Sequence, residues 1–297
     1  MSIQNLHSDI KQNKSRTEIR IYSKELFEER DENGNNALHI AIISQVQVIN
    51  SDTFEDKEDL ILFIMMMSSN QIKNAQNVEG NTPMHEALIQ YNQSMLLPEN
   101  TPQLEALIAG KRKLVMAFLN SSTRAKFDLE NAQGDTQLDL LARSKGLYFW
   151  KYNIFGDVDV NRQNKDGDTA VHISLKHGNL DNVYGLLEIS KINFALQNRD
   201  GDTPLHLAAK LSDAEFYEDL SSTPEIKYSD GTSVILDKGV QNNNGYTAAD
   251  IRRLTVFIGK LSAASIQKLA TAIDKYAREI IHRRNGDKLA TAIIGEI

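Results

Sequence analysis

The sequence contains no cysteine and few rigid or aromatic residues. Among its 297 residues there are five prolines and one tryptophan. The absence of cysteine excludes disulfides, thiolate metal sites and a cysteine nucleophile, and it is consistent with a reducing compartment. A chain of this length can instead bury a large apolar core, either as one long array or as two ordinary domains.

Long apolar runs are absent as well. The longest one, Leu60–Met67, has eight residues, far fewer than the roughly 20 that span a bilayer as a helix. The polar N-terminus, Met1–Ile21, has no apolar signal core. We therefore expect a soluble, cytoplasmic protein without a membrane span. Its formal net charge of −7 argues against general nucleic-acid binding.

A twelve-residue pattern recurs along the chain. The stretch Asn198–Ala209 is nearly repeated by Asn164–Leu175. Glycines with matching surroundings are preceded three positions earlier by Asn or Asp and followed five positions later by His or Asp. These glycines are Gly34, Gly80, Gly134, Gly167, Gly201 and Gly245, with gaps of 46, 54, 33, 34 and 44 residues. Self-similarity at such spacings indicates a repeat array.

The chemistry of each copy predicts a turn followed by a helix. Asn or Asp before Gly favours a tight turn, because Gly tolerates positive φ and Asx side chains bond their own backbone. Thr203 is a candidate N-cap, and Pro204 suits the first helical position, where no N–H is needed. Each unit is too small to bury its own apolar face, so neighbouring units are expected to stack.

The segment Asp200–Ala209 resembles the ankyrin repeat family in the T-P-L-H start of its first helix, and the resemblance extends over about Asp31–Leu254. It implies an all-α ankyrin-repeat solenoid of about six units, each a turn finger plus two antiparallel helices. The expected divisions are an N-terminal helical cap over 1–30, repeats over 31–255 and a C-terminal helical cap over 256–297. A helix over Glu18–Glu29 is predicted for the first cap.

Three insertions interrupt the expected units, near 50–57, 91–102 and 224–238. The first is an acidic loop, Asn50–Lys57, and the second, Tyr91–Pro102, is predicted to be a loop because of its prolines. The third contains two short apolar runs around a turn, so Ile226–Leu236 predicts a β-hairpin. The third unit departs from the pattern, with Gln137 and Asp139 where the family has Pro and His.

The repeated histidines and acidic turns invite a metal interpretation, which we reject. Equivalent positions in stacked units lie roughly 10 Å apart, too far to share one metal. The resemblance implies instead that His39, His85, His172 and His206 are structural hydrogen-bonders. In the acidic turns the glycine is fourth rather than sixth, and Leu175 or Ala209 replaces the glutamate that a calcium loop needs. No catalytic residue, metal or cofactor is expected.

By resemblance, the protein is a non-enzymatic scaffold that binds a protein partner on the concave face made by finger tips and first helices. The candidate contacts share an exposed, variable position beside a repeat glycine or at the end of a first helix. They are Ala132, Gln133, Asp135, Arg143, Lys165, Asp166, Asp168, Lys176, His177, Arg199, Asp200, Asp202, Lys210, Leu211 and Tyr246. Charge reversal at four of them, Lys165, Lys176, Arg199 and Lys210, is expected to abolish partner capture without changing the melting temperature of the monomer.

Other functions stay open at this point. One is an enzyme or toxin-like activity in the insertions or the C-terminal region. Another is contact with nucleic acid or anionic lipid through a basic C-terminal helix, expected over about Ser262–Arg284, although a solvated capping helix is favoured. The irregular repeats, rich in Asn, Ile and Lys, also resemble ankyrin proteins that intracellular bacteria deliver into host cells. That resemblance implies a host protein as partner, in the host cytosol or nucleus.

Overall fold

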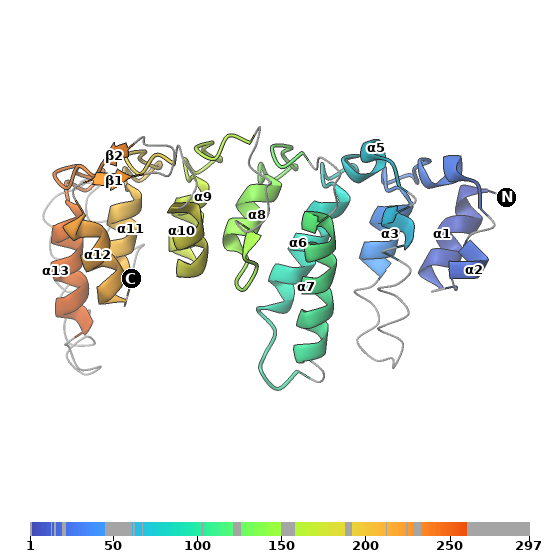
Figure 1. Ribbon diagram of the computed structural model, residues 1–297, viewed down its shortest axis with the longest axis horizontal. Helices are drawn as coiled ribbons and strands as arrows, with labels where there is room; N and C mark the ends of the chain where they lie inside the picture. The colour runs from blue at the N-terminus through green and yellow to red at the C-terminus, as the bar shows by residue number, and fades with distance from the viewer. Residues whose placement is uncertain are drawn as a thin grey trace, which may run out of the picture.

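The molecule is an elongated row of helical units (Figure 1). The computed structural model describes residues 2–44 without 13, 15, 20 and 21, residues 61–120 without 62, 67, 102 and 103, and residues 126–149, 158–187, 192–211, 213–223, 225–227 and 233–259. The helices lie side by side beneath a line of turns, and α1 and α13 lie at opposite ends of the row.

The described elements follow one another as repeated pairs of helices with turns between them. In chain order they are α1 (Ile3–Lys11), α2 (Arg16–Ile19), the 3-10 turn η1 (Lys24–Phe27), α3 (Ala37–Ser44), α5 (Asn70–Lys73), α6 (Pro83–Ser94), α7 (Leu104–Asn120), α8 (Gln137–Arg143), α9 (Ala170–Lys176), α10 (Leu180–Leu187), α11 (Pro204–Lys210), α12 (Ala214–Ser222), β1 (Glu225–Lys227), β2 (Ser233–Ile235) and α13 (Ala248–Gly259).

The fifth unit shows how the repeated residues build a finger and a helix. The N–H of Asn198 bonds the carbonyl of Asp202 at 2.9 Å, and the Asn198 side-chain oxygen accepts the N–H groups of Asp200 and Asp202. Gly201 adopts φ 75°, which a residue with a side chain rarely does. Thr203 then takes an extended conformation as the N-cap of α11. The finger is therefore a local structure encoded by Asn, Gly and Thr.

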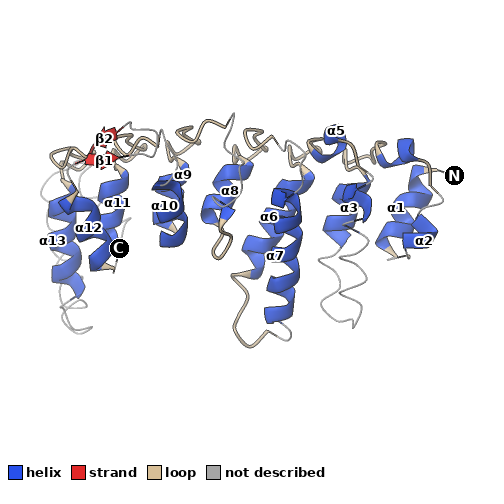
Figure 2. Cartoon of the chain, in the orientation of Figure 1, coloured by secondary structure: helices blue, strands red, loops and turns tan. Residues whose placement is uncertain are grey.

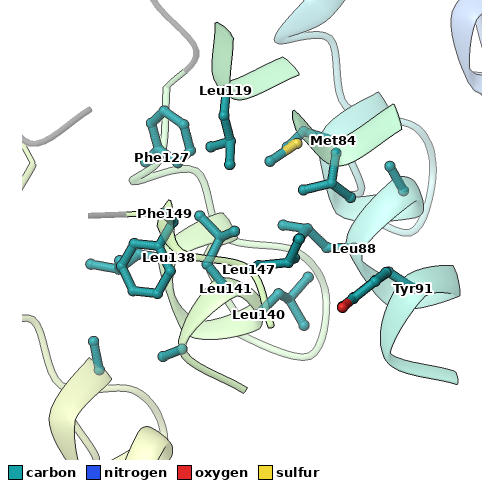
Figure 3. Packing of buried hydrophobic residues seen from close by; sticks show 14 of the residues in the cluster. Met84, Leu88, Tyr91, Leu119, Phe127, Leu138, Leu140, Leu141, Leu147 and Phe149 are labelled. Atoms are coloured by element: carbon teal, nitrogen blue, oxygen red, sulfur yellow. The ribbon is translucent and has the colours of Figure 1, made fainter. Parts of the chain in front are cut away.

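The first helices of successive units form the spine of the array. Helices α3, α6, α8, α9, α11 and α13 pack against one another in that order. Helices α7, α10 and α12 pack as second helices on the first helix of their own unit. One continuous apolar core runs between the layers, and Figure 3 shows it where α6, α7 and α8 meet around Leu88, Leu119 and Leu141. Each unit thus buries its apolar face against its neighbours.

The all-α repeat solenoid and the inserted hairpin are confirmed. Strands β1 and β2 pair antiparallel with Ile226 opposite Val234, and they are the strands of the part of the chain that is described (Figure 2). The sequence predicts helices over Ala37–Ser44, Gln103–Asn120 and Leu180–Leu187, and the structure has α3, α7 and α10 there.

Two local predictions are wrong. The stretch 18–29 does not form one helix, because α2 ends at Ile19 and η1 covers only Lys24–Phe27. The N-terminal end is covered instead by α1, whose Leu6 and Ile10 are buried. The expected loop over Tyr91–Pro102 also begins too early. Helix α6 continues to Ser94, since the Tyr91 ring is fully buried in the core.

Several predictions lie outside the described residues. They are the acidic loop Asn50–Lys57, the turn that joins β1 to β2, and the C-terminal helix over Ser262–Arg284. The divisions at residues 30 and 255 stay predictions.

Candidate partner-binding surface

Backbone hydrogen bonds join neighbouring finger tips at four of the five junctions between units, all except the one between the third and fourth units. The N–H of Val78 donates to the carbonyl of Asn33 at 2.9 Å, and the N–H of Ala132 donates to Glu79 at 2.8 Å. The same bond recurs from Arg199 to Asp166 and from Asn243 to Asp200, each at 2.9 Å. Because these bonds fix one finger against another, the first three tips and the last three tips are held together rather than forming independent loops.

In the second, fourth and fifth units a glutamine four residues before the glycine bonds two units at once. The Gln197 amide donates to the carbonyl of its own Gly201 at 2.6 Å and to that of Gln241 in the next unit at 3.1 Å. Gln163 makes the equivalent bonds to Gly167 and Gln197. These side chains are committed to the array and are not available to a ligand.

In the first, fourth and fifth units the repeated histidine holds its finger to its helix and to the following finger. In the fifth unit His206 Nδ1 receives the Thr203 hydroxyl at 2.8 Å, and Nε2 lies 3.0 Å from the carbonyl of Tyr246. A carbonyl can only accept, so Nε2 carries the proton and Nδ1 accepts. His172 makes the corresponding contacts with Thr169 and Asp202. This geometry gives the histidines a structural role.

Burial favours the neutral form of three of these histidines. It lowers the pKa of His39 and of His85 to about 4, and it lowers the pKa of His172 as well. In the third and sixth units aspartate replaces histidine and reproduces only the acceptor half of the arrangement. Asp139 accepts the Thr136 hydroxyl at 2.9 Å, and Asp250 accepts that of Thr247 at 2.7 Å.

Three pairs of candidate residues form ion pairs across the finger and first helix of one unit. Arg143 lies 3.4 Å from Asp135, and Lys176 and Lys210 each lie 2.6 Å from Asp168 and Asp202. In each pair the carboxylate follows the repeat glycine directly and the cation stands eight residues later. The sequence pattern alone contained this signal, since acid and base occupy both positions together in these three units.

The expectation that all candidates are exposed is wrong for five of them, because Asp168 and Asp202 are buried and Asp135, Arg143 and Leu211 are partly buried. The residue exposures of Asp168 and Asp202 are 3% and 1%, because each carboxylate bonds both its lysine and the amide of the next finger's asparagine. Charge reversal at Lys176 or Lys210 would set two carboxylates against each other, so an unchanged melting temperature is no longer expected there. Leu211 is partly buried and packs against the core.

The other candidates lie along the same edge with less involvement in the array. Ala132, Gln133, Asp166, His177, Arg199, Asp200 and Tyr246 are exposed. Lys165 is exposed too, and its Nζ donates to the carbonyl of Ala132 at 3.1 Å. We call this surface, from Ala132 to Tyr246, the inner strip. Lys145, an exposed residue just after α8, was missed because it lies outside the repeated positions.

Comparison with known proteins agrees with this architecture. Residues 138–230 match the family model described as ankyrin repeats in three copies. This part of the array is built of ankyrin repeats. The chain is also similar to the nuclear factor NF-kappa-B p105 subunit of Gallus gallus, with 27% identity over 167 residues. That match covers 51% of this chain and 16% of the relative, so the chain spans only a small part of the relative's length.

Ankyrin repeats indicate a protein–protein interaction module, and they imply a protein partner. Among the residues that the structure describes, none of the helices is long and apolar enough to cross a bilayer. In that same part of the chain, no three His, Asp or Glu side chains converge as a metal ion would require.

Proposed function

We propose that the protein is a non-enzymatic scaffold that recognises a protein partner through the inner strip. The supporting observation is that some polar side chains of each unit bond within the array, whereas others are exposed. Asparagine, glutamine and histidine are consumed by bonds within the array, whereas Gln133, Arg199 and Tyr246 lie at the edge in exposed positions. A rigid scaffold that presents exposed, variable side chains is suited to recognition, because little ordering entropy is lost on binding.

The proposal extends to where the partner is found. The irregular, Asn-rich repeats resemble those of ankyrin proteins that bacteria deliver into host cells, so we propose a eukaryotic host protein as partner and the host cytosol or nucleus as the place of action. We propose that the scaffold is a monomer.

The test is capture of partners from a eukaryotic lysate, with identification by mass spectrometry. The variant Gln133→Ala/Arg199→Ala/Tyr246→Ala removes three exposed side chains of the inner strip and is expected to keep the melting temperature. The control, Glu218→Lys, changes an exposed residue on the second helix α12. We expect the triple variant to lose the partners that wild type and the control retain. Equal capture by all three would contradict the proposal.

A further inference from the structure

The three ion pairs of the inner strip place cations at one repeat position in consecutive units. Arg143, Lys176 and Lys210 each end a first helix, α8, α9 and α11 respectively. We call them the basic row. Stacked helices lie roughly 8–10 Å apart, so the cations of the row recur at about that interval.

In the fourth and fifth units the cation of each pair is far more accessible than its carboxylate. The side chains of Lys176 and Lys210 are 36% and 51% exposed, whereas those of Asp168 and Asp202 are 5% and 1% exposed. An ammonium has three N–H donors, and one of them is directed to the aspartate. A ligand that approaches these units therefore contacts the lysine ammonium groups, because the aspartate carboxylates that position them are buried.

The carboxylates themselves are tied into the array and cannot move to the surface. Asp168 accepts the amide of Asn198, and Asp202 accepts the amide of Asn242, each at 2.8 Å. These bonds fix the position of each lysine through its aspartate. A partner that binds the lysines loses little side-chain freedom in doing so, because the array has already ordered them.

Further cations extend the row where the third and fourth units meet. His177 follows Lys176 directly, and its pKa is lowered by partial burial and then by Arg143, Lys145 and Lys176. Three positive groups therefore act on one point of the inner strip. The finger tips carry mixed charge, with Asp166 and Asp200 beside Lys165 and Arg199. The basic character thus belongs to the helix ends and not to the tips.

The row is bounded on both sides by apolar side chains at the same repeat position. Ile43 and Ile89 occupy it in the first two units, and Leu254 occupies it in the sixth. Ile43 and Leu254 are 36% and 46% exposed. The inner strip therefore offers one limited cationic segment on a protein whose net charge is −7.

We propose that the basic row binds an extended acidic segment of the protein partner; this inference rests on the proposed function of the inner strip. A segment in the extended polyproline II conformation has three residues per turn and rises about 3.1 Å per residue, so every third side chain faces the same side and advances by about one unit of the array. Carboxylates at positions i, i+3 and i+6 then reach Arg143, Lys176 and Lys210 in turn. Charge-assisted hydrogen bonds supply the attraction.

The experiment measures binding of labelled peptides to the full chain by fluorescence anisotropy. One peptide carries three glutamates spaced every third residue between serines and alanines. A second replaces them with glutamines, and a third has the same composition with the glutamates adjacent. We expect the spaced peptide to bind at least 10-fold more tightly than either comparison peptide, with an affinity that falls as salt is raised. Equal binding of the spaced glutamate and glutamine peptides would overturn the proposal.

A matched protein variant separates the row from net charge. Asp168→Asn/Lys176→Gln/Asp202→Asn/Lys210→Gln removes two acids and two bases, so the net charge stays the same and no buried carboxylate is stranded. The control Lys126→Gln/Glu218→Gln removes one base and one exposed acid outside the row. We expect the first variant to lose at least 10-fold in affinity for the spaced peptide and the control to bind as wild type does. An unchanged affinity of the folded first variant would overturn the proposal.

Two further outcomes distinguish this inference from the proposed function. If a partner captured from lysate binds the folded row variant as well as wild type, the acidic-segment inference fails while recognition through the inner strip still stands. If single-stranded DNA of equal charge binds more tightly than the spaced peptide, the row is a nucleic-acid contact and the inference is overturned. Loss of both peptide binding and capture in the row variant supports it.

Discussion

Arg162 lies 2.9 Å from the carboxylate of Asp139, the residue that stands where four other units have histidine. The same guanidinium contacts Glu130 at 2.7 Å and donates to the carbonyl of Gly134 at 3.1 Å. In the second, fourth and fifth units that glycine carbonyl receives a glutamine amide, which Glu130 cannot provide. Arg162, which belongs to the fourth unit, therefore supplies the donors that the third unit lacks. Asp250 stands in the sixth finger unit, the last one in the part of the chain that the structure describes.

Arg162→Leu is expected to destabilise the protein by about 2–4 kcal/mol, because Asp139 is 2% exposed and would be left as a buried charge without its partner. The measurement is urea unfolding followed by circular dichroism. Adding Glu130→Gln and Asp139→His restores the residues of the other units and should recover much of the loss. A single variant as stable as wild type would show that the guanidinium is dispensable.

Gly201→Ala is expected to cost more stability than Gly245→Ala. The two glycines have similar φ values of 75° and 79°, so the conformational strain of about 1–2 kcal/mol is shared. An added Cβ at Gly201 would lie 2.7 Å from the backbone nitrogen of Asn243, whereas none of the described atoms lies within 4 Å at Gly245. Thermal unfolding of both variants measures the stability that finger stacking contributes. Equal losses of stability in the two variants would contradict the prediction.

Stability is expected to fall as the pH is lowered from about 6.5 toward 4. The pKa of His39 and of His85 is lowered to about 4 by burial, below the ordinary value of 6.5. In that range the unfolded chain binds protons that the folded chain does not, so unfolding becomes easier as pH falls, by on the order of 3 kcal/mol per histidine. Above about pH 7 the contribution is complete and constant.

The carboxylates also titrate at low pH, so the histidines need a direct measurement. Imidazole NMR spectra should show both rings neutral at pH 5.5. The variant His85→Gln should lose part of the slope of unfolding free energy between pH 6.5 and 5. Protonation of either ring near pH 6.5 in the folded protein would contradict the prediction.

The Asp202–Lys210 pair should contribute more to stability than the Asp135–Arg143 pair. The Asp202 side chain is 1% exposed and lies 2.6 Å from its lysine, whereas Asp135 is 19% exposed at 3.4 Å. Lys210→Met should cost about 1–3 kcal/mol by leaving a buried carboxylate, and adding Asp202→Asn should recover most of it. Arg143→Met should cost under about 1 kcal/mol. Double-mutant cycles by urea unfolding measure both couplings, and equal values would contradict this ranking.

The parts of the fold that were predicted correctly depend on short-range chemistry. The turn at Gly201, the cap at Thr203 and the start of α11 are set by residues within a few positions of one another. The hairpin was predictable for the same reason. The N-terminal end was not, because α1 is held by burial of Leu6 and Ile10 against residues distant in the sequence.

Some features of the candidate surface were likewise predictable from local sequence, and others were not. Its position beside the glycines and at the ends of first helices was predictable from the repeat. The burial of Asp168 and Asp202 was not, since it depends on asparagine amides from the next unit, 30 and 40 residues away in the chain. The accessible groups of the Asp168–Lys176 and Asp202–Lys210 pairs are therefore the lysines, although the sequence shows one acid and one base in each pair.

The sequence by itself determined that this chain is a repeat array, because each finger closes through its own Asn, Gly and Thr residues. Only the tertiary structure decided which polar side chains are left for a partner. Stacking places the bridging glutamines, the histidines and two aspartates in bonds between units. It also brings Arg162 of the fourth unit against Asp139 and Glu130 of the third. Those bonds join residues whose proximity depends on how the units stack, which no local pattern specifies.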